Sequence, residues 1–242
     1  MKTIAYTALH YGTDYLYYAI RSVIDYVDEY HVLYSANGSH GHRTAMPNPD
    51  TRHALYREAL RGAGDKLRWH DGDWTHEGQQ RDDIHRIVPD ADVVIVLDAD
   101  EIWPKPLIEA AIQPEKIERI RVPIIHFWRS FHKAVLHDPA YPERVIYPYG
   151  CPGILTLDTP FRIAHMGYAQ RSEIVRYKLE THGHRNEFRR DCDWFADKFM
   201  ANAQIDCHPV GSEYWNPETV DPLDYMPAWM QEHPYFGLAV IP

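Results

Sequence analysis

The pattern of apolar and polar residues near the N-terminus is first typical of a β-strand and then of an α-helix. Residues 2–9 form a short, mostly apolar run, whereas residues 15–27 carry apolar side chains at helical spacing. Between them, Gly12 permits a turn and Asp14 offers an N-cap for the helix. A second apolar run at 30–34 is followed by a polar stretch with Gly and Asn-Pro, which indicates a loop. A strand, a helix and a second strand in this order predict a parallel β-α-β unit.

The pattern continues with helices, a short strand and one fully apolar strand. Helical spacing predicts helices over 51–61 and 79–88, and residues 67–70 predict a short strand between them. Residues 93–97 are all β-branched or aliphatic. Such a run is typical of a strand that is covered on both faces, so we expect it in the middle of the sheet.

The second half of the chain has weaker periodicity. We expect two further strands, at 117–127 and 154–165. We also expect two further helices, at 172–181 and 189–203. Residues 128–152 contain scattered Pro, Tyr and His without a clear period. From Pro209 onward, recurring prolines interrupt regular structure, which predicts an extended tail wrapped over the body.

Together these elements predict one α/β domain over residues 1–242, with a mostly parallel twisted sheet flanked by helices. We expect residues 1–105 and 106–208 to form its two halves and residues 209–242 to form the tail. The apolar run at 93–97 is far too short to cross a bilayer, and no basic segment with a long apolar stretch stands at the N-terminus. We therefore expect a soluble protein without membrane insertion.

The cysteines indicate the redox environment of the protein, and the net charge limits the kinds of partner that it can bind. Cys151, Cys192 and Cys207 cannot all pair with one another, and none stands in a C-x-x-C arrangement. This indicates neither a disulfide framework nor a thiolate zinc site and favours a reducing, cytoplasmic setting. The net charge of −10, from 35 acidic and 25 basic residues, argues against broad nonspecific affinity for nucleic acid. It leaves room for a local basic groove.

Aromatic and basic residues interleave in two segments, at 126–133 and 185–198. Aromatic faces stack on sugar rings or unpaired bases, and Arg and Lys bind phosphates, so both segments are candidates for an acceptor groove. The alternative is a set of core aromatics surrounded by solvated charges. That alternative is the stronger one for Trp194 and Phe195, which stand at helical spacing from Phe199.

The sharpest chemical feature is Leu97-Asp-Ala-Asp-Glu101, immediately after the apolar strand. In open α/β sheets, ligands bind beyond the carboxyl ends of the strands. Because side chains alternate along an extended chain, Asp98 and Asp100 are expected to project to the same side and to hold one divalent cation. Two hard carboxylates suit Mg²⁺ or Mn²⁺. The alternative is a solvated strand end, which is commoner for an isolated D-x-D.

The context of this motif resembles the heart of the GT-A glycosyltransferases. The similarity lies in Gly78-Gln-Gln-Arg-Asp-Asp83, in Ile84-His-Arg86, and in the run from Val93 through the D-x-D-E to Pro104. It covers residues 1–105. The resemblance implies a metal-dependent glycosyltransferase that moves a sugar from a nucleotide-sugar donor, with a UDP-sugar favoured, to a saccharide, a protein or modified DNA. Residues 1–105 would then bind the donor and the metal, and residues 106–208 the acceptor.

The resemblance also assigns donor contacts. It implies that the loop after the first strand lies along the nucleoside, through Thr7, Ala8, His10 and Tyr11. Asn37 stands where the family often has an Asp that reads the base, and this departure leaves the choice of nucleotide open. Arg81 would lie near the nucleotide, the alternative being a surface ion pair with Asp82 or Asp83. Lys178, or Lys198 further on, is a candidate to neutralise a phosphate.

The third metal ligand and the catalytic base are harder to place. The family commonly supplies a later His to the metal, and His165 in Arg162-Ile-Ala-His-Met-Gly167 is similar to that position. His182 and His184 are the rival ligands. An inverting transfer needs a base for the acceptor proton, and the candidates are the acidic residues after the metal motif, namely Asp138, Glu143, Asp191 and Asp193. Whether transfer inverts or retains stays open.

Two other classes of function remain. A nucleotidyltransferase that makes an activated sugar would need a glycine-rich basic phosphate loop near the N-terminus, whereas residues 10–14 hold one glycine and no Lys or Arg. A noncatalytic carbohydrate- or nucleic-acid-binding protein could keep the fold without the activity. The intact Asp98 and Asp100 pair argues against that class.

Overall fold

The computed structural model describes residues 1–38, 42–112, 117–188, 191–202, 208–210 and 215–242, with residues 137–139 described by their backbone alone. The strands are β1 (Thr3–Leu9), β2 (Glu29–Ser35), β3 (Leu67–Gly72), β4 (Val93–Val96), β5 (Glu101–Ile102), β6 (Ile117–Arg121), β7 (Ile124–Trp128), β8 (Lys133–Ala140), β9 (Glu143–Ile146), β10 (Cys151–Thr156), β11 (Ile163–Tyr168) and β12 (Glu218–Thr219). The α-helices are α1 (Leu16–Val23), α2 (Arg52–Ala63), α3 (Glu77–Ile87), α4 (Lys105–Ala111) and α5 (Ser172–Thr181). Short helical turns are η1 (Ile24–Tyr26), η3 (Gly64–Lys66), η4 (Arg185–Glu187), η5 (Phe195–Met200), η6 (Pro222–Asp224) and η7 (Ala228–Glu232).

The larger of the two described sheets has seven strands in the order β10-β6-β9-β4-β1-β2-β3. Its centre is parallel, since β1 pairs in parallel with both β2 and β4, and β2 with β3. β9 runs antiparallel between β4 and β6, so the sheet is mixed. The prediction of an α/β fold with the apolar strand 93–97 in mid-sheet is confirmed.

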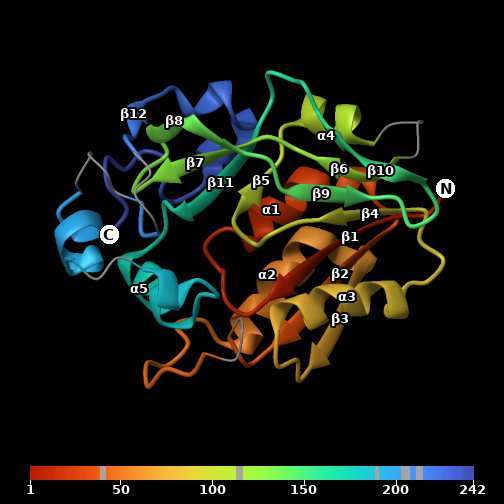
Figure 1. The fold of residues 1–242 in the computed structure, drawn as a ribbon, viewed down its shortest axis with the longest axis horizontal. Helices are drawn as coiled ribbons and strands as arrows, with labels where there is room; N and C mark the ends of the chain where they lie inside the picture. Colours follow the sequence, from red (N-terminus) through yellow and green to blue (C-terminus); the bar gives the residue numbers. More distant parts are fainter. Residues whose placement is uncertain (39–41, 113–116, 189–190, 203–207, 211–214) are drawn as a thin grey trace.

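Helices cover both faces of this sheet. Successive side chains of β1 point to opposite faces, and they enter two different hydrophobic cores. Ala5 and Leu9 pack in the larger core with residues of α1 and α2. Ile4 and Tyr6 face the other side and pack with Ile84 of α3. In Figure 1, α5 lies beyond the arrowhead of β1, at the far side of the molecule from the N-terminus. The carboxyl ends of the central strands therefore face α5.

Two strands that we expected to be continuous are each divided, and this corrects the sequence prediction. Residues 117–127 form β6 and β7, which belong to different sheets. The break falls at Pro123, which has no N–H to donate to a ladder. Residues 154–165 are likewise divided between β10 and β11. The second described sheet, in the order β12-β8-β7-β11-β5, was not predicted.

The helix expected over 189–203 is also corrected. Of its described part, residues 195–200 form one short π-helical segment, η5. Trp194 is buried there in a core cluster with Trp128 and Phe199, and the partly buried Phe195 packs against this cluster, as the core interpretation of Trp194 and Phe195 predicted.

The described chain from residue 215 onward lies along the body with little regular structure. His233 shares a hydrogen bond with the carbonyl of Asp14 (2.9 Å), and its ring stacks on Tyr15 with centroids 4.7 Å apart. The Ile241 N–H donates to the carbonyl of Arg129 over 2.7 Å. These contacts hold the end of the chain against the body. Across the described ranges, no helix is both long enough and apolar enough to cross a membrane.

Candidate functional site

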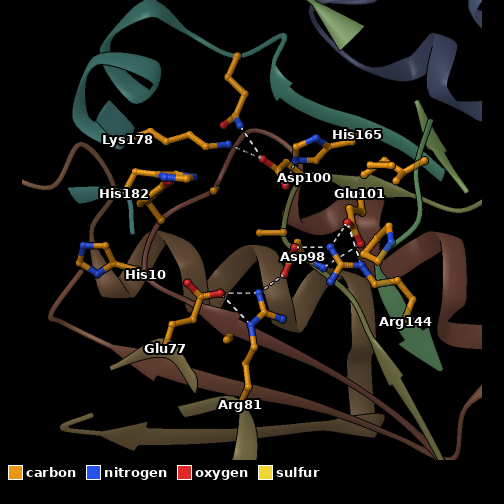
Figure 2. A pocket seen from close by; sticks show the side chains of 18 of the residues that line it. His10, Glu77, Arg81, Asp98, Asp100, Glu101, Arg144, His165, Lys178 and His182 are labelled. Atoms are coloured by element: carbon orange, nitrogen blue, oxygen red, sulfur yellow. Dashed lines mark hydrogen bonds and ion pairs between the residues drawn. The ribbon is translucent and has the colours of Figure 1, made fainter. Parts of the chain in front are cut away.

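A cavity of about 570 Å³ lies beyond the carboxyl ends of β1 and β4. The loop after β1, the first turns of α3 and the turn at residues 98–101 form one side of it. β9, β11 and α5 contribute the other side, and Figure 2 shows Arg144, His165 and Lys178 from these elements directed toward Asp98 and Asp100. The cavity therefore joins the two sheets at the acidic motif.

Backbone contacts hold the acidic turn between the sheets. Thr7, buried in β1, donates its hydroxyl to the carbonyl of Leu97 over 2.7 Å. On the other side, β5 pairs antiparallel with β11 so that Glu101 stands opposite His165. The Met166 N–H donates to the carbonyl of Asp100 over 2.8 Å. Strand pairing thus places Asp100 beside His165.

Asp98 is held by two arginines. Arg81 of α3 donates to Oδ1 and Arg144 of β9 donates to Oδ2, each over 2.7 Å. Burial alone would raise the pKa of Asp98, but Arg144 and Arg81 hold it well below its usual range. Each carboxylate oxygen of Asp98 therefore accepts a hydrogen bond from one arginine.

Glu101 lies beneath this cluster with a fully buried side chain. It accepts hydrogen bonds from the same guanidinium, that of Arg144, including one from Nε over 3.1 Å. Burial raises the pKa of Glu101, although Arg144 opposes that shift. Arg144 therefore balances two acidic groups at once.

Asp100 has a different set of partners. Its Oδ1 lies 3.5 Å from Nε2 of His165, and the two side chains are only 14% and 15% exposed. Its Oδ2 accepts from Gln170 over 2.9 Å and lies 3.9 Å from the Lys178 ammonium. Burial opposes ionisation, but His165 and Lys178 lower the pKa of Asp100 to about 2. Asp100 is thus a charged carboxylate with one oxygen directed at an imidazole.

His165 also contacts a second histidine, His126 of β7. The two Nδ1 atoms are 2.8 Å apart, and the rings meet edge to face. Burial lowers the pKa of His126 well below that of a free imidazole. His126 is therefore neutral at pH 7 and offers either a donor or an acceptor to His165.

The opposite side of the cavity is aromatic and polar. His10 shares hydrogen bonds with the Ser35 carbonyl (2.9 Å) and the Tyr177 hydroxyl (2.8 Å), and burial lowers its pKa. The Tyr11 ring meets Tyr177 edge to face at 5.7 Å. Asn37 donates to Asp73 over 2.6 Å at the rim.

Most residues singled out from the sequence line this cavity: Ala8, His10, Tyr11, Asn37, Arg81, Asp98, Asp100, His165, Lys178 and His182. Thr7 does not line it, because its buried hydroxyl forms hydrogen bonds with the Tyr30 hydroxyl and the Leu97 carbonyl. Glu143 instead pairs with Arg119 and Arg121 on the neighbouring strand. Asp193 precedes η5 and accepts a hydrogen bond from the N–H of Ala196 within that segment.

Two further candidates, Asp191 and His184, are exposed residues outside the lining. The side chain of Asp138 lies outside the described residues. Sequence reasoning assigned no role to several lining residues, namely Glu77, Glu101, Arg144 and Gln170, and it considered His126 only as part of the candidate acceptor segment 126–133. Of these, Glu101 could have been recognised from the sequence, because it is the last residue of the D-x-D-E motif.

The loop after β1 packs directly on the acidic turn at Gly12. Its φ is +130°, and a Cβ there would lie 2.8 Å from the Cβ of Ala99. Gly12→Ala should therefore lower the free energy of unfolding by about 2 kcal/mol or more, through backbone strain and overpacking together. Gly64→Ala is the matched control, because Gly64 also has positive φ but no atom within 4 Å of the added Cβ. Urea unfolding measures both, and equal losses would contradict this packing.

Within the described part of the chain, no group of three or more His, Cys, Asp or Glu side chains is arranged to hold a metal ion by itself. A metal at Asp100 and His165 would have two protein ligands and would need oxygen ligands from a bound molecule. The two side chains fit such a shared site in ligand type and in their approach to each other. No protein-family model matches the chain, and no curated protein matches it significantly.

Proposed function

We propose that the protein is a metal-dependent glycosyltransferase of the GT-A type, which moves a sugar from a nucleotide-sugar donor, with a UDP-sugar favoured, to an acceptor. The observation that carries this proposal is the cavity at the carboxyl ends of β1 and β4, where Asp100 and His165 lie beside three basic side chains. Ligands of open α/β sheets bind at that edge.

The charge of the cavity supports metal dependence. Its described lining holds four carboxyl groups, on Glu77, Asp98, Asp100 and Glu101, and three basic groups, on Arg81, Arg144 and Lys178. A nucleoside diphosphate is itself anionic, so the basic groups alone do not balance it. Asp100 and His165 would hold Mn²⁺ or Mg²⁺, which when bound supplies Lewis-acid stabilisation to the departing diphosphate.

The basic side chains have fixed positions before any ligand arrives. Asp98 holds Arg81 and Arg144 by one oxygen each. Lys178 is anchored by the Gly167 carbonyl at 3.4 Å and lies near Asp100. Donors that are already oriented stabilise developing negative charge without reorganisation during the reaction. In this proposal, Asp98 acts as the anchor of two arginines and Asp100 as the metal ligand.

The aromatic side of the cavity suits the nucleoside. His10 and Tyr11 line the same cavity as Asn37, whose amide oxygen can accept a hydrogen bond from a base. This arrangement supports the assignment of the loop after β1 to the nucleoside.

The loop after β1 also argues against a nucleotidyltransferase. The N–H groups of Gly12 and Thr13 donate to Asp50 over 2.7 and 2.9 Å. Amides that a carboxylate already occupies cannot cradle a triphosphate. This contact counts against the phosphate-binding loop that a nucleotidyltransferase needs.

The test separates the three classes of function by their products. The protein is incubated with a panel of UDP-sugars and Mn²⁺, and nucleotides are resolved by anion-exchange chromatography. We expect UDP and free sugar from at least one donor, by slow transfer to water, and faster release with an acceptor. With added pyrophosphate, UTP and sugar 1-phosphate would instead identify a nucleotidyltransferase. Donors that bind but stay intact with every acceptor would indicate a binding protein.

A further inference from the structure

His126 has no role in the function proposed above, although it lines the cavity and contacts a proposed metal ligand. It lies in β7, which pairs in parallel with β11 so that His126 stands beside His165. The 2.8 Å between the two Nδ1 atoms is a hydrogen-bond distance, so one Nδ1 carries a proton and donates a hydrogen bond, which the other Nδ1 accepts. The tautomers of the two rings are therefore linked.

We propose that His126 is a positioning residue that holds His165 as its Nδ1–H tautomer and aims Nε2 at the metal site. This inference rests on the proposed function, because the metal at Asp100 and His165 belongs to it. A ligating nitrogen needs a free lone pair, so the proton of a ligating His165 must reside on Nδ1. His126 Nδ1 then accepts that proton's hydrogen bond and carries its own proton on Nε2.

The surroundings fix both partners of the pair. The His126 ring lies against Trp215, with centroids 5.0 Å apart, and meets His165 at 80°. On the other side, Gln170 donates to Oδ2 of Asp100 and leaves Oδ1 directed at His165 Nε2. His126 and Gln170 thus orient the two ligands from outside. Outer partners of this kind set ring orientation and ligand basicity, and their loss costs about 10- to 100-fold in metal affinity.

Two substitutions separate positioning from other roles. His126→Phe keeps an aromatic ring against Trp215 but removes both nitrogens. His126→Asn keeps an acceptor near the place of Nδ1, through Oδ1, and removes Nε2. We expect His126→Phe to weaken Mn²⁺ binding about 10- to 100-fold and His126→Asn to restore most of the affinity.

The experiment titrates Mn²⁺ against wild type and both variants in the presence of UDP, with free Mn²⁺ measured by electron paramagnetic resonance. Unchanged affinity in His126→Phe would overturn the inference. Equal loss in both variants would also overturn it, because His126 would then act through Nε2 or through packing. If the wild type binds no Mn²⁺ with UDP, it is the proposed function that fails.

The tautomers of His126 and His165 can also be measured directly in the wild-type protein, so this second test does not depend on whether a variant folds. Long-range ¹H–¹⁵N spectra of the complex with Mg²⁺ and UDP report which imidazole nitrogens carry protons. We expect His165 protonated on Nδ1 and His126 on Nε2. A proton on Nε2 of His165 in that complex would overturn the inference.

Discussion

Asp100→Asn should reduce Mn²⁺-dependent nucleotide binding by roughly 100-fold or more, since loss of a ligand should cost at least as much as loss of an outer partner. The substitution keeps the shape of the side chain and removes its charge. The carboxylate faces His165 at 3.5 Å, and its neighbours lower its pKa to about 2, so it is fully charged at pH 7. An amide is a poorer ligand for a hard cation than a carboxylate. Calorimetric titration with UDP and Mn²⁺ measures the loss.

Asp82→Asn is the matched control for this result. Asp82 is exposed on α3, outside the lining of the cavity, and the substitution makes the same change of charge. We expect wild-type affinity for UDP and Mn²⁺ in the control. Equal affinities in Asp100→Asn and Asp82→Asn would remove Asp100 from the metal site.

The second large effect concerns stability. Arg144→Met should lower the free energy of unfolding by about 3–5 kcal/mol, the usual cost of removing one partner from a buried ion pair. Arg144 is 13% exposed and pairs with Asp98 and with the fully buried Glu101. Without Arg144, the fully buried Glu101 loses the guanidinium that pairs with it. Urea unfolding followed by circular dichroism measures the change.

Arg119→Met controls for the loss of an arginine from the same sheet. Arg119 pairs with Glu143, but its side chain is 49% exposed, so water can solvate both groups when the pair is broken. We expect only a slight change of stability in this control. Adding Glu101→Gln to Arg144→Met should recover part of the loss, because the uncompensated acid is then absent. Similar losses in Arg144→Met and Arg119→Met would contradict the proposed balance.

The first half of the fold was predictable from the sequence because each element there has one clear period. The strands at the N-terminus and at 93–97 are apolar runs bounded by polar turns, and they form adjacent parallel strands. Beyond residue 105, apolar residues continue through Val122 and Pro123 while the chain passes from one sheet to the other. Periodicity reports which residues are buried, and it carries no information on which sheet they enter.

The candidate site was predictable where a motif or the family resemblance marked it. Asp98 and Asp100 stand in a recognisable motif at the end of an apolar strand. Arg144 reaches the same place because β9 pairs with β4, a contact between segments some 50 residues apart in the chain. Its neighbour Glu143, a candidate base, pairs instead with Arg119 and Arg121, because adjacent strand residues point to opposite faces. Which of two adjacent residues reaches the site depends on the register of the strand, and pairing between distant segments of the chain sets that register.

The proposal of a metal-dependent nucleotide site is tested most directly by calorimetric titration of the wild-type protein with UDP, with and without Mn²⁺. We predict binding with Mn²⁺ and little or none without it, because the acidic groups in the described lining outnumber the basic ones. Absence of binding to UDP, and to GDP and CDP, under both conditions would contradict a nucleotide site. Equal binding with and without Mn²⁺ would contradict the role given to Asp100 and His165.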